Sequence, residues 1–128
     1  MYKVMHPKGM NETFARAFNS RDLRNLLCLY EPGAKLCTDG TGTVLGDEAR
    51  IAAALEQLLL LPGTMVSRNH FCIEHGDIAL LRADWRLLDT AGTSVACGSS
   101  CEVARRQADG SWRYVIDHAV GAGLPALP

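Results

Sequence analysis

The fold is decided by residues 14–46, which read FARAFNSRDLRNLLCLYEPGAKLCTDGTGTVLG. Phe14 and Phe18 are one helical turn apart, so they lie on one face of a first amphipathic helix. This helix runs into a polar corner at residues 19–22, which begins a second short helix. The apolar stripe of the second helix ends at Tyr30. The stretch therefore predicts two consecutive helices joined by a tight turn.

The rest of this stretch predicts a strand pair and the start of a third helix. Pro32-Gly33 ends the second helix, and a short strand covers residues 34–38. A glycine-rich turn then leads to a return strand over residues 43–45. Asp47 is placed to cap a third helix over residues 48–61, which is apolar on one face.

The second half changes from a helical to an alternating hydrophobic period. We expect four strands there, over residues 64–74, 78–88, 93–106 and 112–118. Each is separated from the next by a short turn rich in Gly and Asp. Helices followed by an antiparallel meander predict an α+β domain, with the helices packed on one face of a curved sheet.

The length of 128 residues predicts one domain spanning the whole chain. Within it, residues 1–9 read as a loose arm and residues 122–128 as a flexible tail. Asn11 is a candidate N-cap for the first helix, because Asn side chains accept hydrogen bonds from the first free backbone N–H groups.

Composition excludes several classes of partner. The formal net charge is −1 and both signs are scattered, so we expect no nucleic acid partner. The longest apolar run, residues 58–61, is too short to span a membrane, and the first residues have no secretory h-region. These features predict a cytoplasmic protein.

The five cysteines, an odd number, are interpreted as reduced thiols that act as small hydrophobic residues. No C-x-x-C pair is present, although Cys97 and Cys101 are four positions apart on an expected strand. A zinc site needs a closer set of ligands. We therefore expect no metal and no cofactor.

The order of elements in residues 14–46 resembles the opening of the nuclear transport factor 2-like (NTF2-like) superfamily. That superfamily includes the SnoaL-like and ketosteroid isomerase-like domains. Residues 103–118, VARRQADGSWRYVIDH, resemble the closing hairpin of SnoaL-like domains, with an Asp-Gly turn before a Trp-Arg strand. The resemblance implies a cone-shaped, cystatin-like fold with three N-terminal helices on a strongly curved, mostly antiparallel sheet. It also implies one internal pocket.

The ketosteroid isomerase-like pattern fits this sequence only in part. The pattern has a Tyr on the first helix where this chain has Phe14, so the phenol of the oxyanion hole is missing. The catalytic base of the pattern corresponds to Thr38, with Asp39 one residue later. A second acid corresponds to Glu102. The resemblance therefore makes a steroid isomerase unexpected.

Strand alternation supplies the candidate site. Glu102 and Asp117 lie on neighbouring expected strands, and Arg82 and Asp84 lie on the strand beside them. We interpret Glu102 and Asp117 as candidate catalytic acids or bases. The candidate ligand-binding residues are Phe14, Phe18, Tyr30, Asp39, Arg82 and Asp84. An alternative is that Glu102 only forms a cross-strand ion pair with Arg82 or Arg86.

Three functions remain open at this point. The first is an uncharacterised SnoaL-like domain that binds a small, partly polar organic molecule in an internal pocket. The second is a cofactor-independent isomerase or lyase that uses the pocket carboxylates. The third is a protein-association module that works through the sheet face.

The sequence also predicts a homodimer. Trp85, Cys101, Val103 and Trp112 lie on strand faces rich in apolar residues, and domains of this fold commonly pair through the sheet face. A small monomer would leave that apolar surface in water. Pairing with a second copy would cover it.

Overall fold

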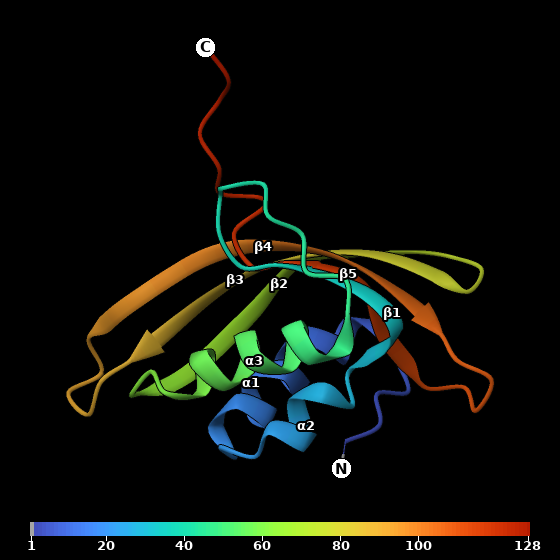
Figure 1. Cartoon of the computed structure of the whole chain (residues 1–128), viewed down its shortest axis with the longest axis horizontal. Helices are drawn as coiled ribbons and strands as arrows, with labels where there is room; N and C mark the ends of the chain where they lie inside the picture. Colours follow the sequence, from blue (N-terminus) through green and yellow to red (C-terminus); the bar gives the residue numbers. More distant parts are fainter. Residues whose placement is uncertain (1) are drawn as a thin grey trace.

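Residues 2–128, described by a computed structural model, form three helices and one five-stranded sheet. The helices are α1 (Met10–Asn19), α2 (Leu23–Leu27) and α3 (Glu48–Leu59), and a 3-10 turn at Pro7–Gly9 precedes them. The strands are β1 (Tyr30–Cys37), β2 (Thr64–His75), β3 (Ile78–Leu88), β4 (Ser94–Arg106) and β5 (Trp112–His118). The sheet arches over the helices, which all lie on one side of it (Figure 1).

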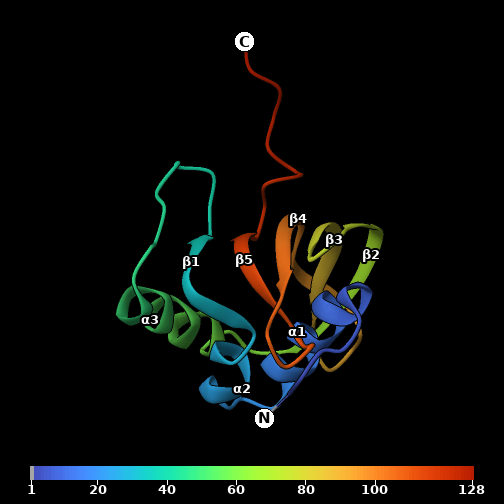
Figure 2. The ribbon, with the colours of Figure 1, turned by 90° about the vertical axis from the view of Figure 1, so that its right-hand side faces the viewer.

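The strand order in the sheet is β1-β5-β4-β3-β2. Strands β2 to β5 form the predicted antiparallel meander, and β1 joins its edge parallel to β5. Helix α3 lies near the β1 edge, and α1 lies near β2 (Figure 2). The helical side of the sheet is called the inner face below, and the opposite side the outer face. The predicted α+β class is confirmed.

Aspartate caps begin two of the helices. The Asp22 side chain accepts a hydrogen bond from the Arg24 backbone at the start of α2. Asp47 does the same for the Arg50 backbone at the start of α3, as predicted. The prediction for Asn11 is wrong, because α1 already begins at Met10 and Asn11 is buried inside the molecule.

Several predicted boundaries are also wrong. Helix α2 ends at Leu27, so Tyr30 begins β1 and Pro32-Gly33 lies within that strand, where the pairing with β5 is irregular. An edge strand tolerates proline because one side of its backbone has no partner to bond. The expected return strand over residues 43–45 is reduced to a single bridge between Leu36 and Leu45.

Residues 2–9 do not form the expected loose arm, and residue 1, which that prediction also covered, lies outside the described residues. Val4 forms an antiparallel bridge with Trp112, and the Trp112 backbone N–H donates to the Val4 carbonyl at 2.7 Å. Val4 and Pro7 are both buried. The tail over residues 122–128 contains no helix or strand. None of the helices in residues 2–128 has the length and hydrophobicity that crossing a bilayer requires.

The hydrophobic core lies between the helices and the inner face. Its largest fully buried side chains include Phe18 and Leu26 from the helices and Leu81, Leu87 and Tyr114 from the sheet. The alternation of β3 decides this arrangement, because Ala79, Leu81, Ala83 and Leu87 all turn inward. Burial of these side chains is the main force that fixes the helices on this face.

Arg21 ties the corner between α1 and α2 to the end of α3. Its guanidinium donates to the carbonyls of Leu59, Leu61 and Gly63 at 2.9, 2.6 and 2.5 Å. These carbonyls follow or end α3, where helical partners are missing. Gly63 itself has a φ of +109°, and a Cβ there would stand 2.8 Å from the Leu88 carbonyl oxygen.

We expect Gly63→Ala to lower the free energy of unfolding by about 3 kcal/mol, because it adds a backbone clash to left-handed strain. Gly92→Ala is the matched control, since Gly92 also has a positive φ of 80° but has no atom within 4 Å of an added Cβ. That variant should lose only about 1 kcal/mol. Urea denaturation measures both values, and equal losses would contradict the proposed clash.

Candidate functional site

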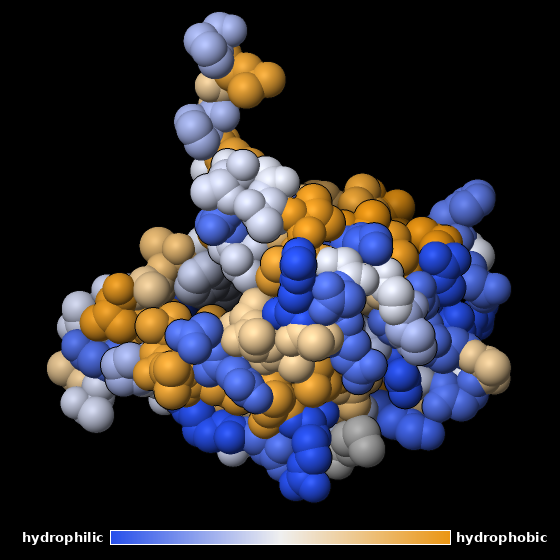
Figure 3. All heavy atoms as spheres, viewed as in Figure 1, coloured by the Kyte–Doolittle hydropathy of each residue, from blue (hydrophilic) through white to orange (hydrophobic). Residues whose placement is uncertain are grey.

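A cavity of about 500 Å³ lies between the inner face and the helices. The surface is hollowed between α3 and the arching sheet (Figure 3). Its wall is apolar at the α3 end and polar toward β4 and β5. The residues around it are Asn11, Phe14, Tyr30, Leu36, Thr38, Ala54, Leu55, Gln57, Leu58, Leu61, Met65, Ser67, Trp85, Ser100, Glu102, Tyr114, Asp117 and Ala119.

Two carboxyl groups form the polar end. Glu102 on β4 and Asp117 on β5 are direct cross-strand partners, so both side chains lie on the inner face. Both are buried, with exposed fractions of 3% and 7%. Both acids line the cavity, and their role there stays a prediction.

A bulge in β5 brings a third polar group to this end. The pairing with β4 shifts between Val103 and Ala104, so that Ile116 and Tyr114 oppose consecutive residues and Val115 is left over. The extra residue lets Tyr114 and Asp117 share the inner face although they are an odd number of positions apart. Strict alternation along residues 112–118 would instead place Tyr114 and Asp117 on opposite faces.

Hydrogen bonds join the two acids to the surrounding side chains. The Tyr30 hydroxyl donates to Asp117 Oδ2 at 2.5 Å, and Asn11 Nδ2 donates to Glu102 Oε1 at 3.0 Å. The Tyr114 hydroxyl donates to Asn11 Oδ1 at 2.6 Å. Asn11 is therefore held by Tyr114 in the orientation that turns its amide N–H toward Glu102.

Burial changes the protonation of both carboxyls. Loss of solvation and the nearby charge of Asp117 raise the pKa of Glu102 to about 8, against the opposing effect of Ser100 and Asn11. Loss of solvation likewise raises the pKa of Asp117 to about 6, and the hydrogen bond from Tyr30 partly offsets the shift. The two acids therefore share a proton near neutral pH.

The tyrosines remain proton donors. Burial, followed by the charge of the adjacent acid, raises the pKa of Tyr30 well above its usual value. The pKa of Tyr114 rises for the same reasons. Their rings lie 5.2 Å apart, and the Phe14 ring meets Tyr114 edge-on at 6.3 Å. The polar end is therefore lined by aromatic faces as well as by hydroxyl groups.

Trp85 also lines the cavity. Its indole lies against Gly98 on β4, where an added Cβ would stand 2.6 Å from the ring. The indole N–H donates to the Ala119 carbonyl at 2.7 Å. Glycine at this strand position therefore makes room for a flat aromatic surface beside the cavity.

The structure corrects the placement of Arg82 and Asp84. Both lie on the outer face, because Arg82 pairs with Cys101 and Asp84 with Ser99, which alternate with the inward residues. Asp84 accepts hydrogen bonds from Ser99 Oγ at 2.6 Å and shares one with His70 at 2.7 Å. The sheet separates Arg82 from the cavity.

The alternative ion pair between Glu102 and Arg82 or Arg86 is excluded by the same alternation. Leu81 is the cross-strand partner of Glu102, and it is buried on the inner face. Arg86 pairs with Cys97, on the outer face. A charged group on one face of a sheet cannot contact a group on the other.

The four other predicted ligand-binding residues have different outcomes. Phe14 and Tyr30 line the cavity, but Tyr30 contributes its hydroxyl rather than only an apolar wall. Phe18 is fully buried in the core and is not among the lining residues. Asp39 is exposed and accepts hydrogen bonds from Thr41, whereas its neighbour Thr38 lines the cavity.

The tryptophans also differ from their expected role in an interface. Trp85 lies on the inner face, and Trp112 is only 4% exposed. Of the four expected interface residues, only Cys101 and Val103 lie on the outer face. All five cysteines are free thiols.

Four residues that line the cavity were not predicted as site residues: Asn11, Trp85, Ser100 and Tyr114. Asn11 had a usable signal, because it lies at helical spacing from Phe14 and Phe18 on the inward face of α1. Ser100 shared its predicted strand face with Glu102. Tyr114 had no such signal, since the bulge in β5 reverses its predicted face.

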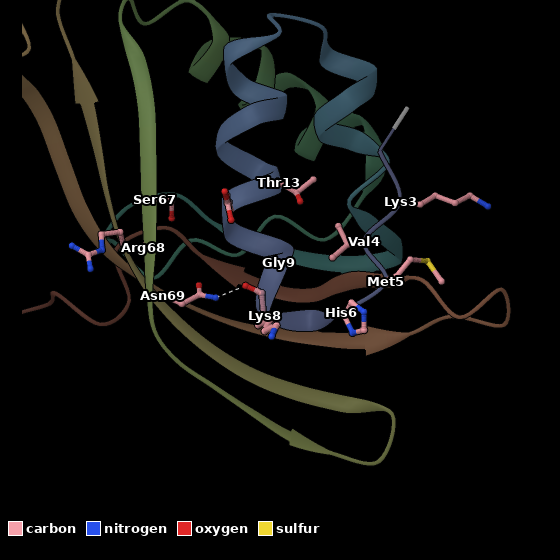
Figure 4. Close-up of a pocket in the computed structure, with 11 residues that line it drawn as sticks. Lys3, Val4, Met5, His6, Lys8, Gly9, Thr13, Ser67, Arg68 and Asn69 are labelled. Atoms are coloured by element: carbon pink, nitrogen blue, oxygen red, sulfur yellow. Dashed lines mark hydrogen bonds between the residues drawn. The ribbon is translucent and has the colours of Figure 1, made fainter.

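A second hollow, of about 800 Å³, lies between the N-terminal segment and β2 (Figure 4). The Asn69 side chain donates to the Lys8 carbonyl across it at 2.6 Å. Lys3 extends away from the hollow in Figure 4 and bonds to Asp109 at 2.9 Å. Among residues 2–128, no group of three or more His, Cys, Asp or Glu side chains is placed to hold a metal ion.

The comparison with solved structures identifies the fold. A protein from Thiobacillus denitrificans superposes with a TM-score of 0.78 over 94% of this chain and 98% of its own, at 22% identity. Its provisional name is calcium/calmodulin-dependent protein kinase type II association domain. An NTF2-like protein of unknown function from Shewanella oneidensis has a TM-score of 0.68 at 17% identity, over 85% of this chain and 91% of its own.

The chain has the NTF2-like fold. A ketosteroid isomerase-like protein from Erwinia carotovora agrees, with a TM-score of 0.71 over 86% of this chain and 88% of its own, at 18% identity. No protein-family profile and no curated protein sequence matches. The resemblance predicted from the sequence is therefore confirmed at the level of the NTF2-like fold. One fold can host many activities, so the activity of this chain depends on the residues of its site.

The buried acids of this NTF2-like domain should make its stability depend on pH. The folded pKa of Glu102 is raised from 4.5 to about 8, so the folded state holds a proton that the unfolded state releases. The free energy of unfolding should therefore fall as pH rises between these values. Asp117 acts in the same direction between 3.8 and about 6.

We expect Glu102→Gln to flatten this profile, because a neutral amide carries no proton to release, and to be at least as stable as the wild type near pH 8. Glu56→Gln, on the exposed side of α3, is the matched control and should leave the slope unchanged. Urea denaturation over this pH range measures the slope. If the free energy of unfolding of the wild type does not decline over this range, the pKa of Glu102 is not raised by folding and the prediction is wrong.

Proposed function

We propose that the chain binds a small, partly polar organic molecule in the internal cavity, with Glu102 and Asp117 as its polar anchors. The observation that carries this proposal is a pair of buried carboxyls facing a cavity of about 500 Å³. Cavities of roughly 300–1,000 Å³ that combine an apolar wall with a few polar groups are typical of small-molecule sites.

The energetics of the acids support a ligand. Burying a carboxyl costs free energy that hydrogen bonds must offset. Asp117 receives one such bond, from the Tyr30 hydroxyl, whereas the side chains of Asn11 and Ser100 both interact with Glu102. A ligand that bonds to the remaining oxygens would offset more of the cost. The site is therefore better satisfied when occupied.

Acid–base chemistry is a second candidate, in the form of a cofactor-independent isomerase or lyase. The raised and separated pKa values of Glu102 and Asp117 favour it, because one group can donate a proton while the other accepts one near neutral pH. A steroid isomerase is not proposed, since Thr38 lies at the position where the related pattern has its base and cannot act as one.

Pairing with a second copy through the outer face is a third candidate. Ile73, Leu80, Val103 and Ile116 form a continuous row across four strands, and three of them are exposed by 45% or more. Beside this row, the buried Nε of Arg82 has no hydrogen-bond partner among the described residues. A second copy would cover the apolar row and could supply an acceptor for Arg82.

The cavity proposal is tested with N-phenyl-1-naphthylamine, a neutral fluorophore that reports on apolar cavities. Ala54 lines the cavity on α3, whereas the adjacent Ala53 is exposed. Ala54→Trp should fill the cavity and weaken probe binding about tenfold or more, while Ala53→Trp should match the wild type. A fluorescence titration measures the three affinities. Equal affinities would place the probe elsewhere and overturn the proposal.

The dimer is tested by sedimentation at micromolar concentration. We expect a wild-type dimer, and we expect Leu80→Asp to be monomeric because it places a charge in the apolar row. Leu60→Asp, on an exposed residue outside the sheet, should remain dimeric. A wild type that sediments only as a monomer would exclude this candidate.

A further inference from the structure

The charges around the cavity have one sign. Its lining contains two acids, Glu102 and Asp117, and two phenols, Tyr30 and Tyr114. Among the described residues, no Lys, Arg or His lines this cavity. The positive groups of the sheet lie elsewhere, as Arg82 does on the outer face. A bound anion would therefore meet buried acids with no cation to neutralise them.

Aromatic rings surround the same space. Phe14, Tyr30, Trp85 and Tyr114 all line the cavity, and three of the four belong to one contact cluster at the acidic end. The face of an aromatic ring carries negative charge density and attracts organic cations. Acids and ring faces together form an environment that favours a positive charge.

Acceptors for N–H groups are also available. Glu102 accepts from Asn11 on Oε1, and Asp117 accepts from Tyr30 on Oδ2. The Ser100 side chain also interacts with Glu102, whereas the second oxygen of Asp117 receives no hydrogen bond from the described side chains and is left for a ligand. The two acids are cross-strand partners, so one ammonium group with several N–H donors can bond to both.

We propose that the cavity selects an organic cation, an amine whose ammonium group bonds to Glu102 and Asp117 and whose apolar body lies along Trp85 and α3. This inference rests on the proposed function and names the ligand class of the same site. The apolar body is required by the far wall, where Ala54, Leu58 and Leu61 line the cavity. A small hydrophilic amine would leave that wall in contact with water only.

Three ligands of the same shape test this inference. They are 2-naphthylmethylamine, which is a cation at neutral pH, the neutral 2-naphthylmethanol and the anionic 2-naphthoate. A fluorescence competition measures how well each compound displaces N-phenyl-1-naphthylamine from the wild type. We expect the amine to bind about tenfold or more tightly than the alcohol, which corresponds to one charge-assisted hydrogen bond, and the carboxylate to bind weakest.

Asp117→Asn removes one acid and keeps the shape of the site. In this variant the amine should lose about tenfold in affinity, while the alcohol should change by less than about threefold. Glu56→Gln removes an exposed acid from α3 and controls for a general effect of protein charge; it should preserve the preference for the amine. The wild-type ratio of amine to alcohol needs no variant, so the test survives if Asp117→Asn fails to fold.

The outcomes separate the two proposals. If the alcohol or the carboxylate binds as tightly as the amine, the cation inference is overturned while the cavity remains a ligand site. If neither the fluorophore nor any of the three compounds binds, both proposals fail. A preference for the amine that persists unchanged in Asp117→Asn would also overturn the assigned anchor.

Discussion

Two carboxyl groups on neighbouring strands face each other inside this domain, and the polar interior is arranged around them. Charged pairs of one sign are expensive to bury, so each acid requires a donor or a proton. Tyr30 on β1 donates a hydrogen bond to Asp117. Asn11 on α1 donates one to Glu102, and Tyr114 holds Asn11 in place. These contacts connect α1, β1 and both strands of the closing hairpin to one point. The free-energy cost of burying the two acids therefore depends on the positions of three separate elements, α1, β1 and β5.

The class of the fold and the two acids could be predicted from the sequence, because both depend on regular periods. The alternation of β3 and β4 is regular around Leu81 and Glu102, and the inward position of Glu102 followed from it. The bulge at Val115 in β5 and the short α2 depend on tertiary packing, which no local pattern encodes. The prediction for Arg82 is wrong because a strand face that carries both charged and apolar residues can either line a cavity or face water.

The sheet divides the chemistry of the molecule between its two faces. Acids, phenols and aromatic rings face inward, whereas Arg82, the His70–Asp84 pair and the exposed apolar row face outward. A ligand and a partner chain would therefore use different surfaces of the same strands. Solved structures with this fold include a protein named as an association domain and one named as ketosteroid isomerase-like, so the fold by itself does not determine a role.

The indole stacked on Gly98 has a spectroscopic consequence. The chain contains two tryptophans, and only Trp85 borders the cavity, while Trp112 is enclosed in the core beside Val4. A molecule entering the cavity would replace water next to one emitter and leave the surroundings of the other unchanged. The protein thus carries an intrinsic optical sensor of occupancy together with its own internal reference, and neither requires a label.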